Sequence, residues 1–198
     1  KALGAINSKL KNLNWKINKN FCSTKENVKR VISENTLSNV TCNCSLSGGT
    51  VCSITHIQLK RLNLSGVLPA DFGNLTNLKE LLDFLSYDLE IEKDQMNFLS
   101  FNSDLTSNYI NGSIPSSFSQ LHLVILSLSG NRLSGEIPNG IGEIGSLEEL
   151  VLEANQLDGH LPENLGNLRN LKRLTIDGTA ISGKIPGFIG NWSKLEKL

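Results

Sequence analysis

The repeating unit of this chain is clearest in Leu147-Glu-Glu-Leu150-Val-Leu152-Glu-Ala-Asn155-Gln-Leu157-Asp-Gly159-His-Leu161-Pro162, which continues as Glu-Asn-Leu-Gly-Asn-Leu168. Leu150 and Leu152 are two positions apart, so on a strand both side chains point into the core while their neighbours face solvent. A Gly-x-(Leu/Ile)-Pro motif recurs, with intervals of 46, 23, 24 and 24 residues between Pro69, Pro115, Pro138, Pro162 and Pro186. A single coil cannot bury such an aliphatic row alone, so the period predicts an α/β solenoid of about five stacked coils.

The asparagine of this unit recurs at Asn108, Asn131 and Asn155. A buried amide is costly unless it is hydrogen-bonded, and its donors and acceptor can satisfy backbone groups at the turns of adjacent coils. Leu62 holds the same slot in the first coil and Thr179 in the last. We therefore predict a ladder of asparagine side chains that link adjacent coils by hydrogen bonds, with weaker links at its two ends.

One interval between the prolines is about double the others, and an insertion explains it. Residues 78–81 are the first half of a strand, and residues 104–112 supply the second half of the same coil. Residues 82–103 are therefore predicted to be an insertion of 22 residues. Because insertions are best tolerated at exposed loop tips and this one interrupts a strand, we interpret it as a splicing artefact. The alternative interpretation is that residues 82–103 are a genuine insertion with a function of its own.

The segment 1–53 is predicted to cap the first coil, while residues 54–198 form about five coils and a truncated sixth. Apolar side chains at helical spacing predict an amphipathic helix from Leu3 to Ile17, and those at 28–32 suggest a second, shorter one. Disulfides would staple this cap, and three connectivities are open for Cys22, Cys42, Cys44 and Cys52.

Composition excludes several classes of protein. The 198 residues hold 19 basic and 19 acidic side chains, without the basic excess of a nucleic-acid binder. No apolar run approaches the roughly 20 residues that cross a bilayer, and the first residues lack signal-peptide features, so we expect a missing N-terminus. Clustered cysteines favour the secretory route, as do six glycosylation sequons at Asn39, Asn43, Asn63, Asn74, Asn111 and Asn191.

Three patterns suggest chemistry, and the repeat explains each better. The glycines at 140–145 match a nucleotide-binding fingerprint, but Gly142 occupies a slot that is glycine in other coils. The cysteines nearest His56 could bind zinc, yet His56 lies in an outward strand slot. The acidic cluster at 148–153 resembles a glycosidase pair, but nothing encloses it or raises its pKa. We therefore expect no enzyme activity, metal or cofactor in this chain.

The outward strand slots are the candidate binding face, because solenoid proteins usually bind through their concave surface. These slots are basic in the first coil, apolar in the third, acidic in the fourth and mixed in the fifth. We predict that Val124, Ile125 and Val151 form the apolar centre of a protein contact, with ordinary surface residues as the alternative interpretation. The candidate partner-binding residues are His56, Gln58, Lys60, Arg61, Val124, Ile125, Ser127, Glu148, Glu149, Val151, Glu153, Arg173 and Thr175.

Residues 54–198 resemble the plant-specific leucine-rich repeat through their Leu-x-Gly-x-Ile-Pro coils. The segments 39–44, 51–60 and 181–192 are similar to receptor-like kinases that carry a malectin-like domain after the repeats. The resemblance implies a leucine-rich-repeat coil stack with a parallel concave sheet and an N-terminal helical cap. It also implies that a malectin-like domain, one transmembrane helix and a cytoplasmic Ser/Thr kinase lie outside this sequence.

The function implied by the resemblance is extracellular ligand or co-receptor binding at the plasma membrane, as part of transmembrane signalling. The expected partner is a protein, a peptide or a cell-wall-associated ligand, and the membrane is reached only through missing C-terminal parts. Two alternatives stay open: a secreted leucine-rich-repeat inhibitor of cell-wall hydrolases, and a non-functional mis-spliced fragment. Both termini fall inside repeat or helix patterns, so we expect a fragment.

Overall fold

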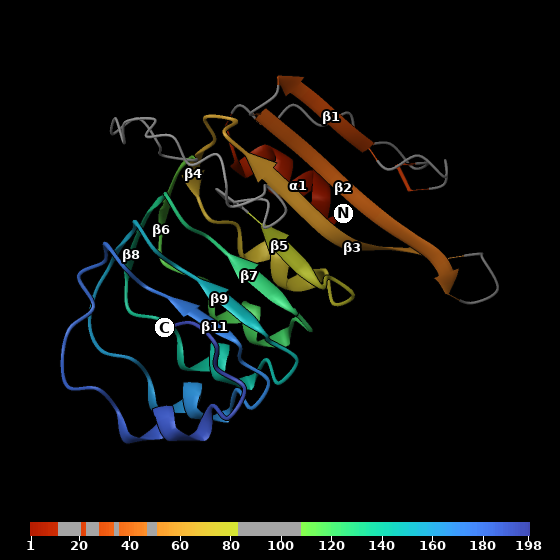
Figure 1. Ribbon diagram of the computed structural model, residues 1–198. Helices are drawn as coiled ribbons and strands as arrows, with labels where there is room; N and C mark the ends of the chain where they lie inside the picture. Colours follow the sequence, from red (N-terminus) through yellow and green to blue (C-terminus); the bar gives the residue numbers. More distant parts are fainter. Residues whose placement is uncertain (12–20, 23–27, 34–35, 47–50, 83–107) are drawn as a thin grey trace, which may run out of the picture.

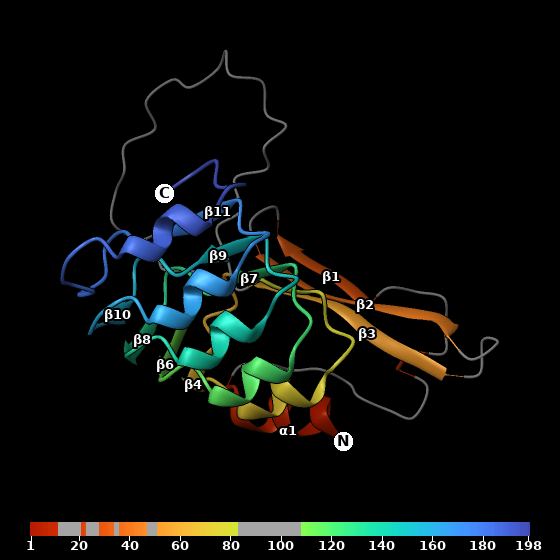
Figure 2. The same ribbon diagram turned by 90° about the horizontal axis from the view of Figure 1, so that it is seen from below.

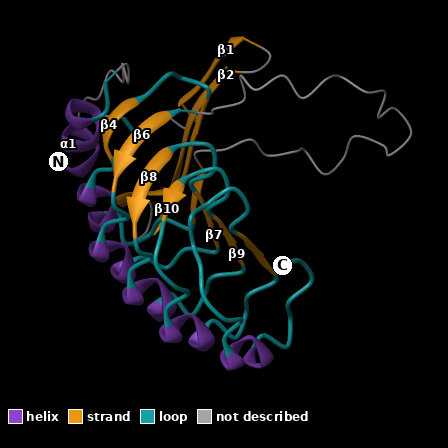
Figure 3. Ribbon diagram, turned by 90° about the vertical axis from the view of Figure 1, so that its left-hand side faces the viewer, coloured by secondary structure: helices purple, strands orange, loops and turns teal. Residues whose placement is uncertain are grey.

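The computed structural model describes residues 1–11, 21–22, 28–33, 36–46, 51–82 and 108–198 (Figure 1). These residues form a curved stack of coils. Strands line one side of the stack, and a row of short helical turns lines the opposite side (Figure 3). The architecture confirms the predicted α/β leucine-rich-repeat solenoid with a parallel sheet.

The main sheet follows the concave side in the order β1-β2-β3-β5-β7-β9-β11. From β3 onward all pairs are parallel, and the register aligns one repeat position across the coils, as in Leu126 beside Leu81 and Leu150. The 24-residue period therefore sets the register. The strands are β1 (Val28–Ser33), β2 (Thr36–Leu46), β3 (Val51–Lys60), β5 (Glu80–Leu82), β7 (Ile125–Ser127), β9 (Glu149–Val151) and β11 (Arg173–Thr175).

A second, smaller parallel sheet lies on the flank of the stack, in the order β10-β8-β6-β4 (Figure 3). Its strands lead into the Gly-x-(Leu/Ile)-Pro motif, where Gly135 has a φ of 79° that side-chain-bearing residues rarely adopt. The glycine of the motif is therefore a requirement of this turn. The strands are β4 (Ser65–Val67), β6 (Tyr109–Gly112), β8 (Arg132–Gly135) and β10 (Gln156–Leu157).

The convex side consists of 3-10 helices that each begin directly after the proline of the motif (Figure 2). Proline fixes φ near −65° and gives up an N–H that a helix start leaves unpaired in any case, so it suits this position. At Pro138, for example, φ is −62°. The helices are η2 (Ala70–Asn74), η4 (Ser116–Gln120), η5 (Asn139–Glu143), η6 (Glu163–Asn167) and η7 (Gly187–Asn191).

The core is one hydrophobic cluster that runs from the cap to the last coil. Leu128 and Leu152 lie in it at 1% exposure or less, and Ile176 packs against it while partly buried. Leu105, the remaining predicted member of this row, lies outside the described residues. Successive coils therefore bury each other's aliphatic side chains, which is the predicted source of stability.

The asparagine ladder connects neighbouring coils through backbone groups. The Oδ1 atom of Asn155 accepts a hydrogen bond from the Leu133 N–H at 3.0 Å, and its Nδ2 donates to the Leu128 carbonyl at 2.8 Å. The side-chain oxygens of Asn108 and Asn131 also accept hydrogen bonds from backbone N–H groups of the preceding coil. In the last slot, Thr179 donates to Ile176 of its own coil. As predicted, the C-terminal end of the ladder is therefore linked less strongly to the preceding coil.

The N-terminal cap contains one element that was predicted wrongly. Helix α1 (Ala2–Lys9) buries Leu3 and Ile6, while residues 12–20 of the predicted helix lie outside the described residues. Residues 28–33 form strand β1, antiparallel to β2, instead of the expected short helix. Valine and isoleucine have high strand propensity, and pairing with β2 gives their backbone groups partners.

Two disulfides link the four cysteines of the cap, Cys22 to Cys42 and Cys44 to Cys52. The second disulfide joins β2 to β3. Strand β3 also crosses the predicted boundary between residues 53 and 54, so the cap and the first coil share a strand. A hydrogen bond from Lys9 to Asp71, at 2.5 Å, ties α1 to η2 and holds the pKa of Asp71 below its usual range.

The predicted insertion begins inside strand β5. Leu82 ends this strand and pairs with Gln58 and Ser127, whereas residues 83–103 lie outside the described part of the chain. Among the described residues, none of the helices has the length and apolar character that crossing a membrane requires.

Candidate binding face

The predicted contact residues all lie on strands of the concave sheet or directly beside them. β3 carries His56, Gln58 and Lys60, with Arg61 one residue after its end. The others belong to β7, β9 and β11 or flank these strands within two residues, and they are Val124, Ile125, Ser127, Glu148, Glu149, Val151, Glu153, Arg173 and Thr175.

A row of ionisable side chains with one apolar side chain at its centre crosses the middle of this face. The strand register places His56, Glu80, Ile125, Glu149 and Arg173 next to one another in that order. The Nε2 atom of His56 is 3.6 Å from Oε1 of Glu80, and Nη1 of Arg173 is 3.6 Å from Oε2 of Glu149. Ile125 is therefore a half-buried apolar side chain between the His56–Glu80 contact and the Arg173–Glu149 ion pair.

The adjacent row contains Val124, Glu148 and Lys172. Nζ of Lys172 donates to Oε2 of Glu148 at 2.6 Å. This hydrogen bond, together with the negative charge of Glu148, raises the pKa of Lys172 above its ordinary value. Val124 precedes Ile125 in sequence, and the two form an apolar spot beside this pair. Four charges in the two rows, those of Glu148, Glu149, Lys172 and Arg173, are thus neutralised by partners within the sheet.

A third row of predicted contact residues is buried. Ser127, Val151 and Thr175 are between 1% and 4% exposed. Strands lie only about 4.8 Å apart, and side chains on a concave surface converge. Small side chains are therefore covered by the larger side chains beside them. Val151 therefore offers little surface to a partner, although the sequence placed it in the apolar centre of the contact.

Hydroxyl groups in this buried part of the face lack hydrogen-bond partners. The Oγ atoms of Ser127 and Ser129 and the Oγ1 atom of Thr175 are buried without one among the described residues. Most buried polar groups in folded proteins are paired, so these three are exceptions that need an explanation.

Sequence reasoning missed Glu80 as a member of this face. Glu80 was missed because its coil was interpreted as interrupted. Its place in Leu78-Lys-Glu-Leu81 equals that of Glu149 in the fourth coil, so counting slots from the first leucine would have found it.

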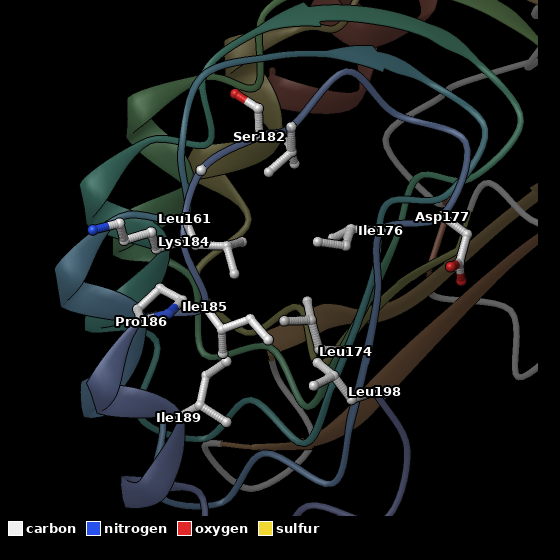
Figure 4. Close-up of a pocket in the computed structure, with 12 residues that line it drawn as sticks. Leu161, Leu174, Ile176, Asp177, Ser182, Lys184, Ile185, Pro186, Ile189 and Leu198 are labelled. Carbon is white, nitrogen blue, oxygen red and sulfur yellow. The ribbon is translucent and has the colours of Figure 1, made fainter.

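The cavity at the C-terminal end of the stack is a different kind of surface (Figure 4). It has a volume of about 290 Å³ and is lined by aliphatic side chains that include Leu174, Ile176 and Ile189. These residues belong to the same inward rows that coils elsewhere bury against each other, and Ile185 at its rim is 85% exposed. The cavity is therefore the end of the solenoid core, bounded on one side by the inward-facing Leu174 of β11.

The sequon asparagines differ in their accessibility. Asn63, Asn74 and Asn111 are exposed and lie on the flank or at a convex helix, whereas Asn43 is exposed on β2, all four outside β3, β5, β7, β9 and β11. Asn39 and Asn191 are half-buried, and the Nδ2 atom of each already donates a hydrogen bond, to Gln58 and Gly166 respectively. Glycans at Asn63, Asn74 and Asn111 would leave the concave strands uncovered.

We expect secreted protein to carry glycans at Asn63, Asn74 and Asn111, with much lower occupancy at Asn39 and Asn191. A glycan at either half-buried site would replace an amide hydrogen in a packed environment and disfavour the folded chain. Peptide mass spectrometry after enzymatic deglycosylation in heavy water measures the occupancy of each site. High occupancy at Asn191 in folded protein would contradict this prediction.

Comparison with known proteins finds similar leucine-rich-repeat proteins. The Leucine Rich Repeat family model matches residues 122–144 and 146–168. A probable LRR receptor-like serine/threonine-protein kinase of Arabidopsis thaliana is 38% identical over 135 residues, which are 67% of this chain and 11% of that protein. The chain thus spans about a tenth of the length of this relative.

Solved structures of plant receptor ectodomains have the same fold. The ectodomain of the Arabidopsis thaliana receptor kinase GASSHO1/SCHENGEN3, in complex with CASPARIAN STRIP INTEGRITY FACTOR 2, is 31% identical with a TM-score of 0.64, over 80% of this chain and 16% of that one. The Arabidopsis receptor kinase HAESA, in complex with the peptide hormone IDA and the co-receptor SERK1, is 26% identical with a TM-score of 0.55, over 100% of this chain and 32% of that one. This chain is a leucine-rich-repeat solenoid related to the plant leucine-rich-repeat receptor-like kinases.

Proposed function

We propose that this chain is the extracellular repeat domain of a plant receptor-like kinase and that it binds a peptide ligand or a co-receptor through the concave strands β3 to β11. The relatives and solved neighbours support this proposal, since they are receptor kinases and two of the neighbours are bound to ligands. The single observation that carries it is the concave face itself, where charged and apolar side chains lie in register and the exposed sequons lie elsewhere.

The proposal includes the parts of the parent protein that the resemblance implies. A malectin-like domain, a transmembrane helix and a Ser/Thr kinase would follow the repeats, and residues 1–53, 54–198 and 82–103 would be the cap, the coils and an insertion. Sequencing the full transcript tests this part directly. An open reading frame that continues into a membrane span and a kinase supports it, and a stop codon soon after a capping coil favours a secreted inhibitor instead.

Binding through the concave face is best tested at Ile125. Its side chain lies between Glu80 and Glu149, so Ile125→Asp places a third acidic group next to these two and removes the apolar centre. The purified chain would be titrated by calorimetry with the SERK1 ectodomain and with a panel of synthetic secreted plant peptides.

We expect Ile125→Asp to weaken whichever interaction is found by at least about tenfold, as for a contact at the centre of an interface. Ser134→Asp is the matched control, because Ser134 is exposed on the flank strand β8 and the substitution adds the same charge. Equal affinities for the two variants would rule out the concave face as the binding surface.

A further inference from the structure

In the described part of the chain, four charges that lie at or just after the ends of β3, β9 and β11 have no ion-pair partner. Lys60 ends β3 and Arg61 follows it, while Glu153 and Asp177 follow β9 and β11. Among the described residues none of the four forms an ion pair, unlike the charges of the two rows between His56 and Lys172. At these strand ends the unpaired charges are therefore basic on β3, at the N-terminal side of the stack, and acidic on β9 and β11, toward its C-terminal side.

Three of these charges occupy the same position in the repeat. Lys60, Glu153 and Asp177 each directly follow the second core aliphatic residue of their coil. Backbone hydrogen bonds hold this row together, from the Gly130 N–H to the Glu153 carbonyl and from the Ala154 N–H to the Asp177 carbonyl. With about 4.8 Å between strands, the three to four strand spacings from β3 to β9 and β11 separate the two charges by about 14 to 19 Å.

The floor between the two charged ends consists in part of small, buried side chains. Ser129 belongs to the same row and is 2% exposed, Ser127 lies two residues before it and is 1% exposed, and Thr175 on β11 is 4% exposed. At these positions no large side chain projects from the sheet, so there is room for an extended segment that lies across the strands.

We propose that the concave face selects an extended peptide segment with an acidic group at one end and a basic group about four to six residues away. The acidic end lies over Lys60 and Arg61, and the basic end lies over Glu153 and Asp177. The length follows from about 3.3 Å of extended chain per residue across 14 to 19 Å. This inference rests on the proposed function, and it adds the charge order and the length of the ligand segment.

Synthetic peptides test the charge order without knowledge of the natural ligand. The probes are a dipolar peptide with two aspartates and two basic residues separated by four Ser/Gly residues, a peptide of equal composition with alternating charges, and all-basic and all-acidic peptides of equal length. Fluorescence anisotropy with the complete chain, at low and at physiological salt, measures each affinity. We expect the dipolar peptide to bind about tenfold more tightly than the alternating one, and the preference to weaken with salt.

Charge reversal of one end changes the preferred probe. Lys60→Glu with Arg61→Glu makes both ends acidic, so this variant should prefer the all-basic peptide. Glu153→Lys with Asp177→Lys makes both ends basic, so that variant should prefer the all-acidic peptide. Asp158→Lys with Lys184→Glu is the matched control, because both side chains are exposed away from the concave strands, and its preference should stay dipolar.

The outcomes separate this inference from the proposed function. If the dipolar and alternating peptides bind equally and Ile125→Asp weakens both, the concave face binds peptides but the charge order is wrong. If no dipolar peptide binds, the inference is likewise overturned, while the Ile125 comparison with larger partners still decides the proposed function. Equal probe preferences in the two charge-reversed variants would also overturn it.

Discussion

Gly142→Ala is expected to lower the thermal unfolding midpoint of this chain by about 10 °C. Gly142 lies in η5, and a Cβ atom at this position would lie 2.0 Å from the carbonyl oxygen of Asn164 in η6. That oxygen belongs to the backbone of the next coil, so a side-chain rotation cannot relieve the overlap. Overpacking costs typically 1–3 kcal/mol, and about 3 kcal/mol corresponds to this shift for a chain of this length.

Gly190→Ala is the matched control for this prediction. Gly190 holds the same slot in η7, but no atom lies within 4 Å of the Cβ that alanine would add there. Neither glycine has a positive φ, so backbone strain does not distinguish the two positions. The control midpoint should stay within about 2 °C of the parent or rise slightly, since alanine restricts the unfolded chain. Thermal unfolding followed by circular dichroism compares the two variants. Equal midpoints would show that neighbouring coils can move apart along their helical side without a loss of stability.

The stacking of the coils could be predicted from sequence because one period controls it. Once Leu126, Leu150 and Leu174 are recognised as equivalent, a parallel sheet with these residues side by side follows. The same reasoning placed Asn155 inside, because an inward amide at a turn has backbone groups to bond. These predictions depend only on the repeat, so they hold wherever the repeat is intact.

Burial on the concave face could not be predicted in the same way. The alternation of a strand places Ser127 and Val151 outward, but their exposure depends on the curvature of the whole stack and on the size of neighbouring side chains. The cap fails for a related reason. A six-residue segment such as Val28–Ser33 fits a short helix or a strand, and only its pairing with β2 selects between them.

Asn155→Ala should destabilise the stack more than any single surface change, by about 4 kcal/mol. The substitution removes the acceptor of the Leu133 N–H and a donor to the Leu128 carbonyl, both in the preceding coil. The amide is only 6% exposed, so water does not readily replace these bonds, and each unsatisfied buried group costs about 1–3 kcal/mol. Urea titration followed by circular dichroism measures the loss as a lower transition midpoint.

Thr179→Ala, in the same slot of the last coil, provides the comparison. Its hydroxyl donates to Ile176 within one coil, so we expect a loss of about 1 kcal/mol. The difference between the two variants measures how much of the ladder's contribution arises between coils. Each coil of a solenoid is stabilised mainly by contacts with its neighbours. Weakening the contact between coils at Asn155 should therefore also broaden the urea unfolding transition or divide it into two steps, with the C-terminal coils unfolding first. Equal losses for Asn155→Ala and Thr179→Ala, each with one sharp transition, would mean that aliphatic packing alone couples the coils.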